Sequence, residues 1–266
     1  MHHHTTPAAD DELPFNPANR AIDAAELDQL LADHGLPRGT VRNPNLYRCA
    51  FVHSSYVLRK NQAFDAGNER RPPGCLPLQE MAYERLEFLG DAVLGCACGE
   101  YLYKRFPSED EGFLTRMRTG IVNGASLADI AAQMDLGRFA IVSRQIEEAG
   151  GRENPRILED IFEALVGAIL VDSGGDYGAA RAFLVAVFET YVDWSDLLTQ
   201  KPHVKERLAK RAGAVRYLEV EVATRGGRRV FTVAAKTPDG RLLGTGRGAS
   251  RRLAERAAAN DALRSG

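Results

Sequence analysis

The sequence predicts an all-α domain over residues 21–199, followed by a small α+β domain over residues 203–266. Up to about residue 200, no segment shows the sustained apolar–polar alternation of a half-buried strand. Alternation then appears at residues 217–223, inside an order of one helix, three strands and one helix. Charge changes at the same place: residues 201–266 hold 16 Lys and Arg against 6 Asp and Glu, whereas the first 200 residues hold 18 against 30.

Composition is that of an ordinary globular protein, with 44% hydrophobic residues among 266. No apolar stretch reaches the ~20 residues of a membrane span, and the N-terminus lacks the apolar core of a secretory signal. His2–His4 are interpreted as a tag remnant or a disordered start rather than a metal site. The four cysteines are too few for a disulfide framework in a chain this long, so we expect reduced, mostly buried thiols in a cytoplasmic protein.

The first domain is expected to begin after a polar, proline-containing and disordered segment, residues 1–20. A helix should run from Ala24 to His34, because Asp23 can cap its start and Gly35 can end it. A second helix should contain Tyr47 to Leu58. Apolar periodicity predicts five more helices, and glycine and proline predict a loop at 147–155. These helices are expected at about 84–106, 112–123, 126–134, 157–171 and 177–191.

A linker at Gln200–Pro202 should lead into the second domain. Its elements follow from a change of period and from turn residues. Pro238–Gly240 should form a hairpin turn, and Ser250 should cap the closing helix. The expected elements are a helix at 205–212, strands at 217–223, 230–235 and 242–246, a turn at 225–229, and an Ala-rich helix after residue 250.

One run, Glu84 to Leu94, places carboxylates on an otherwise apolar helix. At about 100° per residue, Glu84, Glu87 and Asp91 fall within an arc of roughly 60°. The positions one turn further on are Phe88, Asp91 and Gly95, so no Lys or Arg neutralises the arc. The alternative reading is a solvated acidic face, which the apolar character of the helix disfavours.

A second largely apolar run, residues 157–172, carries Asp160 and Glu163 one turn apart. If the two helices pack side by side, four carboxylates face one another. At about 5.5 Å and an effective dielectric of about 20, each pair would repel by roughly 3 kcal/mol. Either protonation or a hard divalent cation would relieve this repulsion, and Mg²⁺ suits a site of carboxylates and waters that receives phosphate.

These runs resemble motifs of the ribonuclease III family. The run at 84–94 resembles its signature helix, and residues 158–165 resemble its second acidic motif. Residues 50–56, 111–115 and 121–123 are similar to further family segments, in the family's order. The resemblance covers roughly residues 45–175. Residues 60–80 form a connection longer than bacterial relatives usually have, either a mobile surface loop or an element that contacts RNA or a partner.

The resemblance implies roles for individual residues. Four carboxylates are implied as catalytic residues that ligate Mg²⁺, which Mn²⁺ can replace. Glu84 and Glu111 are implied to support the metal or the scissile strand; the alternative for each is an ordinary surface carboxylate. Phe88 is implied to insert into the partner at a two-fold homodimer interface; its alternative is an intramolecular core aromatic. Independently of the resemblance, Arg156 lies one turn before Asp160, a spacing at which it can offset the charge of this residue. The four carboxylates are Glu87, Asp91, Asp160 and Glu163.

The α-β-β-β-α order of the second domain resembles a double-stranded-RNA-binding domain. By this resemblance, the residues that open its last helix contact RNA, with a solvated basic face as the alternative; these are Ser250, Arg251, Arg252 and Arg256. Lys205-Glu206 stands where relatives often have Gln-Glu, and the 225–229 turn lacks the usual Pro/His loop. Affinity should therefore depend strongly on charge and on salt.

The resulting expectation is a metal-dependent endonuclease that cleaves double-stranded RNA as a homodimer, leaving 5′-phosphate and 3′-hydroxyl ends. The alternative is a non-catalytic RNA-binding or ribosome-associated relative of the same fold. Such relatives typically lack some of the carboxylates, and the presence of all four favours the enzyme. His53 is expected to be a hydrogen-bonded structural histidine rather than a catalytic base.

Overall fold

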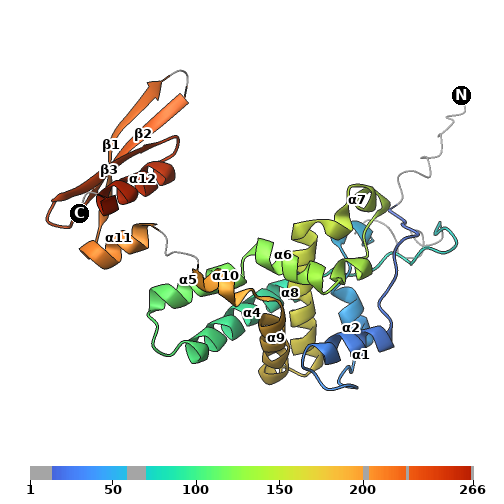
Figure 1. Ribbon diagram of the computed structural model, residues 1–266. Helices are drawn as coiled ribbons and strands as arrows, with labels where there is room; N and C mark the ends of the chain where they lie inside the picture. The colour runs from blue at the N-terminus through green and yellow to red at the C-terminus, as the bar shows by residue number, and fades with distance from the viewer. Residues whose placement is uncertain (1–13, 59–69, 200–203, 226–227, 265–266) are drawn as a thin grey trace, which may run out of the picture. The chain divides into compact units, whose positions relative to one another are not determined.

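The computed structural model describes residues 14–58, 70–199, 204–225 and 228–264 (Figure 1). The chain divides into two compact units: Met1–Glu109 with Met117–Trp194, and Asp110–Arg116 with Ser195–Gly266. The first unit is mainly helical, and the second contains a three-stranded antiparallel sheet with flanking helices. The predicted fold class is therefore confirmed. The predicted linker at 200–202 and His2–His4 lie outside the described residues.

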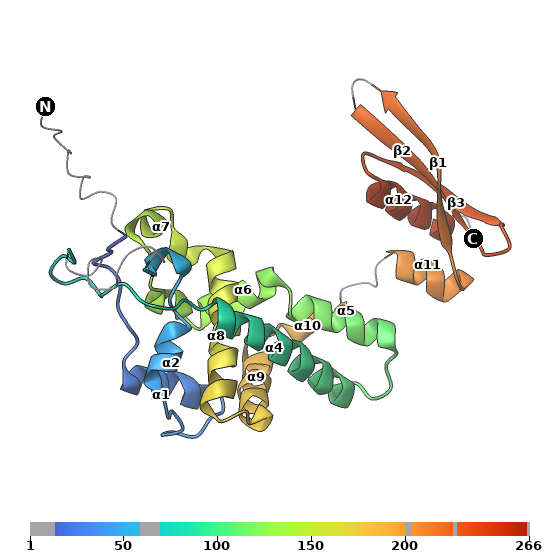
Figure 2. The same ribbon diagram turned by 180° about the vertical axis from the view of Figure 1, so that it is seen from behind.

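The helices of the first unit gather around α4 and α8, which share the most extensive contact between helices (Figures 1 and 2). No helix in the described ranges is long and apolar enough to cross a membrane. The bounds before α8 are α1 (Ala24–Asp33), α2 (Pro44–Cys49), η2 (Ser54–Tyr56), α4 (Glu84–Arg105), α5 (Glu111–Ile121), α6 (Gly124–Gln133), η3 (Leu136–Phe139), α7 (Arg144–Glu148) and η4 (Gly151–Glu153). Then come α8 (Pro155–Asp172), α9 (Tyr177–Tyr191) and α10 (Trp194–Thr199).

Capping residues set several helix starts. The Asp23 side chain accepts a hydrogen bond from the Glu26 backbone N–H, and the Glu26 side chain accepts one from the Asp23 N–H, which completes the predicted cap as a capping box. The Asn154 side chain caps α8, and Pro155 occupies the first helical position, where no intrahelical N–H is needed. Most of α8 is buried, so the helix is held in place by its neighbours. The residue at which it begins therefore fixes where its side chains lie.

The predicted helix from Tyr47 to Leu58 is wrong beyond Cys49. The chain leaves α2 there, and Val52 forms a parallel bridge with Ile141. The His53 side chain accepts a hydrogen bond from the Ser55 N–H and so caps η2. This local side-chain contact competes with a continuous helix.

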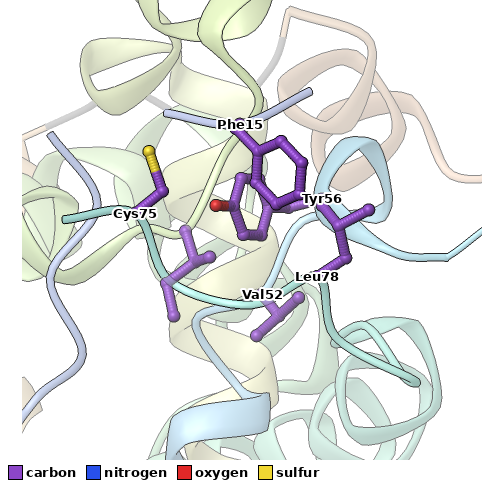
Figure 3. Close-up of a cluster of buried hydrophobic side chains, with 6 residues drawn as sticks. Phe15, Val52, Tyr56, Cys75 and Leu78 are labelled. Atoms are coloured by element: carbon purple, nitrogen blue, oxygen red, sulfur yellow. The ribbon is translucent and has the colours of Figure 1, made fainter. Parts of the chain in front are cut away.

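A cluster of buried side chains explains why this segment is not helical (Figure 3). Phe15, Val52, Tyr56, Cys75 and Leu78 pack together, with the Phe15 and Tyr56 rings 6.4 Å apart and edge to face. Residues 14–20 are thus packed rather than disordered as predicted, because Phe15 fills the cluster and two buried asparagines bind the Val142 carbonyl. Residues 1–13, and the 59–69 part of the predicted connection, lie outside the described residues.

Two smaller predictions also differ. The expected loop at 147–155 contains the end of α7 and all of η4, where Arg152 donates hydrogen bonds to the Ala140 carbonyl and to Glu147. The contact with Ala140 joins residues 12 apart in sequence, so the turn-forming residues of this segment did not reveal it. The cysteines were expected to be mostly buried, and Cys75 and Cys98 are, but Cys96 is exposed.

The second unit has the predicted α-β-β-β-α order: α11 (Val204–Ala212), β1 (Arg216–Arg225), β2 (Arg228–Lys236), β3 (Leu242–Gly248) and α12 (Arg251–Arg264). The strands lie in the order β1-β2-β3, and the predicted hairpin turn is closed by hydrogen bonds between Thr237 and Arg241. The tip of the predicted β1–β2 turn, residues 226–227, lies outside the described residues.

Small residues bring α12 onto the sheet. A methyl group on Gly244, Gly246 or Gly248 of β3 would overlap the backbone of α12, whose facing positions include Ala254 and Ala258. Leu208 of α11 completes the small core. The N-terminal turns of α12, where the predicted RNA-binding residues lie, are thus fixed to a rigid strand.

Candidate functional site

Two glycines let the backbones of α4 and α8 approach each other closely. A methyl group on Gly90 of α4 would overlap the carbonyl oxygen of Glu163 on α8. One on Gly167 of α8 would overlap the carbonyl oxygen of Leu86 on α4. Glycine inside a helix lowers helix stability by up to about 1 kcal/mol relative to alanine. The close contact between the two helices, which no larger residue would allow at these positions, offsets this loss.

The contact brings the four predicted carboxylates together. Glu87 is partly buried and Asp91 is exposed on α4, whereas Asp160 is partly buried and Glu163 is only 8% exposed on α8. Burial, followed by the negative charge of Asp91 and of the neighbouring acids, raises the pKa of Glu163 to about 8. A buried carboxyl group surrounded by other carboxylates therefore holds its proton well above the ordinary range.

Asp160 and Glu87 belong to the same electrostatic unit. Burial raises the pKa of both carboxyl groups, and the charge of Asp160 further raises that of Glu87. The buried Tyr83 hydroxyl donates a 3.0 Å hydrogen bond to Asp160 and holds this side chain in place. Arg156 opposes the rise in the pKa of both acids, which is the charge offset that its spacing predicted.

The donor set fits a hard divalent cation. Within the described residues, none of the four carboxylates takes part in an ion pair, and the nearly buried Glu163 has no hydrogen-bond partner. Carboxylate oxygens that are not already paired with Lys or Arg are suitable ligands for Mg²⁺ and Mn²⁺. In the described part of the chain, no three His, Cys, Asp or Glu side chains are arranged so that they could hold a metal ion as they stand.

Glu84 and Glu111 are both exposed. Glu84 opens α4, and its charge raises the pKa of Glu87, so it lies near the four carboxylates. Glu111 opens α5 and accepts a 2.8 Å hydrogen bond from the Thr115 hydroxyl. The structure thus groups Glu84 with the predicted site and gives Glu111 a contact within its own helix.

Phe88 is 81% exposed, which excludes the alternative of an intramolecular core aromatic. The apolar character of the run at 84–94 therefore does not mean that this position is buried. Beside it, Met81, Leu86 and Leu89 line a hollow of about 390 Å³ that also reaches Val171 at the end of α8. Met81 and Val171 are themselves exposed, so an apolar surface with a hollow lies next to a projecting aromatic ring.

Sequence reasoning missed one acidic residue, Glu159. It is partly buried, and its charge raises the pKa of both Glu163 and Glu87. The available signal was its position one turn before Glu163 on α8. His53, by contrast, behaves as predicted: it bonds Ser55 and packs against the Tyr83 ring, and burial lowers its pKa.

In the second unit, the four predicted RNA-binding residues are all exposed at the start of α12. The Ser250 hydroxyl accepts a hydrogen bond from the Leu253 N–H and caps the helix as predicted. Arg251 donates to Glu255 at 3.0 Å, and Lys205 of α11 forms an ion pair with the same carboxylate. Arg252 and Arg256 share this end of the helix, so cationic groups from α11 and α12 lie side by side.

Comparisons with known proteins agree with both units. Residues 43–189 match a family model described as ribonuclease-III-like, and residues 200–265 match one described as a double-stranded RNA binding motif. A protein named ribonuclease 3 from Streptococcus pneumoniae is 34% identical over 91% of this chain and 97% of its own length. A putative protein of Paramecium bursaria Chlorella virus 1 is 40% identical over 69% of this chain and 67% of its own length.

A solved structure of the nuclease domain of ribonuclease III from Campylobacter jejuni gives a similar result. It covers 64% of this chain and 98% of its own, at 32% identity and a TM-score of 0.50. That structure is described as showing flexibility in a region involved in dimer formation.

Proposed function

This chain belongs to the ribonuclease-III-like family, and on that premise we propose that it is a metal-dependent endonuclease of double-stranded RNA. It hydrolyses phosphodiester bonds and leaves 5′-phosphate and 3′-hydroxyl ends. The observation that carries the proposal is Glu163, a carboxyl group 8% exposed, without a cation partner among the described residues, and surrounded by other acids. Such a carboxyl group is suited to act as a ligand for a cation that binds from solution.

We assign Mg²⁺ to this site, with Mn²⁺ as a substitute. Four oxygen donors hold it: Glu87, Asp91, Asp160 and Glu163. When bound, a divalent ion lowers the pKa of a coordinated water and stabilises negative charge on the leaving oxygen of the phosphodiester. With an ion bound, Glu163 would be ionised, because the positive charge would offset the repulsion that raises the pKa of this carboxyl group.

The surrounding residues position these donors. Tyr83 holds Asp160 through a hydrogen bond to one carboxylate oxygen, so the other oxygen would remain available as an ion ligand. Glu84, near the four carboxylates, supports the site or the bound strand, and Glu111 is assigned the same role on family grounds. Arg156 offsets part of the negative charge of the site, because its guanidinium acts on Asp160 and Glu87.

The second unit holds the RNA. Ser250, Arg251, Arg252 and Arg256 present a helix N-terminus and guanidinium groups to phosphates, which suits recognition of a duplex by its shape. We place the nuclease domain at 21–199 and the RNA-binding domain at 203–266. The prediction of a cytoplasmic location rests on composition alone.

We further propose that the chain works as a homodimer, joined through the apolar surface of α4. Phe88 projects into solvent, and the adjoining hollow of about 390 Å³ is large enough to receive an aromatic ring. Two copies related by a two-fold axis satisfy both features at once, since each ring can enter the hollow of the other copy. Phe88→Asp should give a folded monomer in analytical ultracentrifugation, whereas the exposed Tyr103→Asp on the same helix should leave the dimer intact.

One experiment tests the enzymatic proposal. Long double-stranded RNA is incubated in Mg²⁺ with the parent protein and with Glu163→Ala. Cleavage by the parent, together with binding but no cleavage by the variant, supports the endonuclease. Equal inactivity of both, with RNA still bound, would favour a non-catalytic relative of the same fold. Failure of both to be retained on immobilised double-stranded RNA would leave the basic second unit without a role.

A further inference from the structure

We propose that Glu159 is a fifth carboxylate of the divalent-ion centre, and that Gly124 is the residue that makes room for it. This inference rests on the proposed function and extends it, because none of the residues assigned to the centre by family resemblance is Glu159. In this role, Glu159 raises the affinity of the site for a hard divalent cation.

The register of α8 places Glu159 beside the predicted ligands. At about 100° per residue, Glu163 lies roughly 60° from Asp160 on one side and roughly 40° from Glu159 on the other. Glu159 therefore extends the acidic arc, with Glu163 in its middle. It is partly buried, and within the described residues its carboxylate forms no ion pair. Glu163 is 8% exposed, forms no ion pair within the described residues, and interacts electrostatically with the same group of acids.

Gly124 determines where the Glu159 carboxylate can lie. A Cβ atom on Gly124 would lie 2.5 Å from Glu159 Oε2, 2.7 Å from Oε1 and 2.8 Å from Cδ. The carboxylate therefore occupies the space that a side chain at position 124 would fill. Gly124 is the first residue of α6, a helix of ten residues, and the positive end of a helix dipole favours a carboxylate there.

Electrostatics connects Glu159 to both helices of the site. The negative charge of Glu159 repels those of Glu163 and Glu87, and the charges of Asp160 and Asp91 repel Glu159 in turn. Arg156 is the cation whose charge attracts Glu159. A cation placed among the four assigned ligands is therefore attracted by Glu159 as well, directly or through a coordinated water.

The experiment measures Mn²⁺ binding to metal-free protein by electron paramagnetic resonance, without RNA. Glu159→Gln removes the charge and keeps the size of the side chain. Gly124→Ala keeps the charge but pushes the carboxylate out of its space, at little cost in stability because only the end of a flexible side chain must move. The control is Asp129→Asn, which removes an exposed carboxylate from α6.

We expect Glu159→Gln and Gly124→Ala each to weaken Mn²⁺ binding by about tenfold, the lower range for groups around a metal's direct ligands. The double variant should bind no more weakly than either single variant, because both changes remove the same interaction. Asp129→Asn should bind like the parent, and all variants should unfold within a few degrees of it. The Mg²⁺ concentration for half-maximal cleavage should rise by the same factor.

Parent-like Mn²⁺ affinity in Glu159→Gln would overturn the inference, as would additive losses in the double variant. In either case the proposed function stands if the parent cleaves double-stranded RNA and Glu163→Gln does not. If the parent itself neither binds Mn²⁺ nor cleaves RNA, the proposed function and this inference are overturned together.

Discussion

Glu163 in the nuclease unit and Glu255 in the RNA-binding unit both lie on helices and are shielded from solvent, yet the pKa values of their carboxyl groups shift in opposite directions. Glu163 is surrounded by carboxylates, and its pKa rises to about 8. Glu255 accepts hydrogen bonds from Lys205 and Arg251, and its pKa falls. Within the described residues, one acid is paired with two cations of its own chain and the other with none.

The contrast shows that close packing alone does not determine how much a shielded carboxylate destabilises the folded state. Both units use glycine to bring backbones together, at Gly90 and Gly167 between helices and at Gly246 between strand and helix. In the RNA-binding unit, the packed elements present complementary charges. In the nuclease unit, the packed helices present like charges, and the folded state carries repulsion that an external cation relieves.

The largest expected effect separates catalysis from binding. Glu163→Gln should lower kcat by about 10²–10³-fold, the range for removal of one preorganised electrostatic group, while RNA is still retained. Arg251→Ala should instead weaken binding and reduce the slope of log affinity against log salt by about 1, with cleavage restored at high RNA concentration. Single-turnover kinetics and filter binding at several salt concentrations check both. Loss of retention in Glu163→Gln would contradict the division of roles.

The second prediction tests the close approach of the helices. Gly90→Ala should destabilise the nuclease unit by about 3 kcal/mol, because the methyl group meets backbone rather than a movable side chain. The matched control is Gly95→Ala on the same helix, where no atom lies within 4 Å, and it should stabilise the protein by up to about 1 kcal/mol. Urea unfolding monitored by circular dichroism measures both. Equal effects of the two variants would show that the glycine contact is unimportant.

The third prediction concerns pH without divalent ions. The pKa of Glu163 is raised in the folded state, so the unfolded chain loses this proton first, and stability falls as pH rises from about 4.5 to about 8. Glu163→Gln should remove most of this slope and be about 2 kcal/mol more stable than the parent at pH 8, well below the full effect of such a shift. Thermal unfolding from pH 5 to 8 in a chelator, then in excess Mg²⁺, measures it. A parent whose stability rises over this range would contradict the assignment.

The sequence predicted the elements that depend on local patterns. The cap at Asp23, the span of α9, the α-β-β-β-α order and the carboxylates on α4 and α8 all follow from spacing along the chain. The segment after Cys49 was predicted incorrectly, because the bridge between Val52 and Ile141 depends on residues far apart in sequence.

Exposure was harder to predict than helicity. Phe88 lies within an apolar helix, and only the fold shows that its ring faces solvent. Glu159 was missed for a similar reason. Its position one turn before Glu163 was visible in the sequence, but its contact with Gly124, 35 positions earlier in the chain, was not.

The smallest expected effect has the opposite sign to that at Glu163. Glu255→Gln should destabilise the RNA-binding unit by about 1 kcal/mol at pH 7, since partly exposed ion pairs with Lys205 and Arg251 are screened by water. Because the folded pKa of Glu255 is lowered, this stabilisation is present above about 4.5 and is lost as pH falls through the folded pKa. The difference in unfolding temperature between the parent and Glu255→Gln should therefore be largest near pH 7 and should shrink as pH falls below about 4.5. A more stable Glu255→Gln at pH 7 would place Glu255 with Glu163, as an acid whose charge the fold opposes rather than pairs.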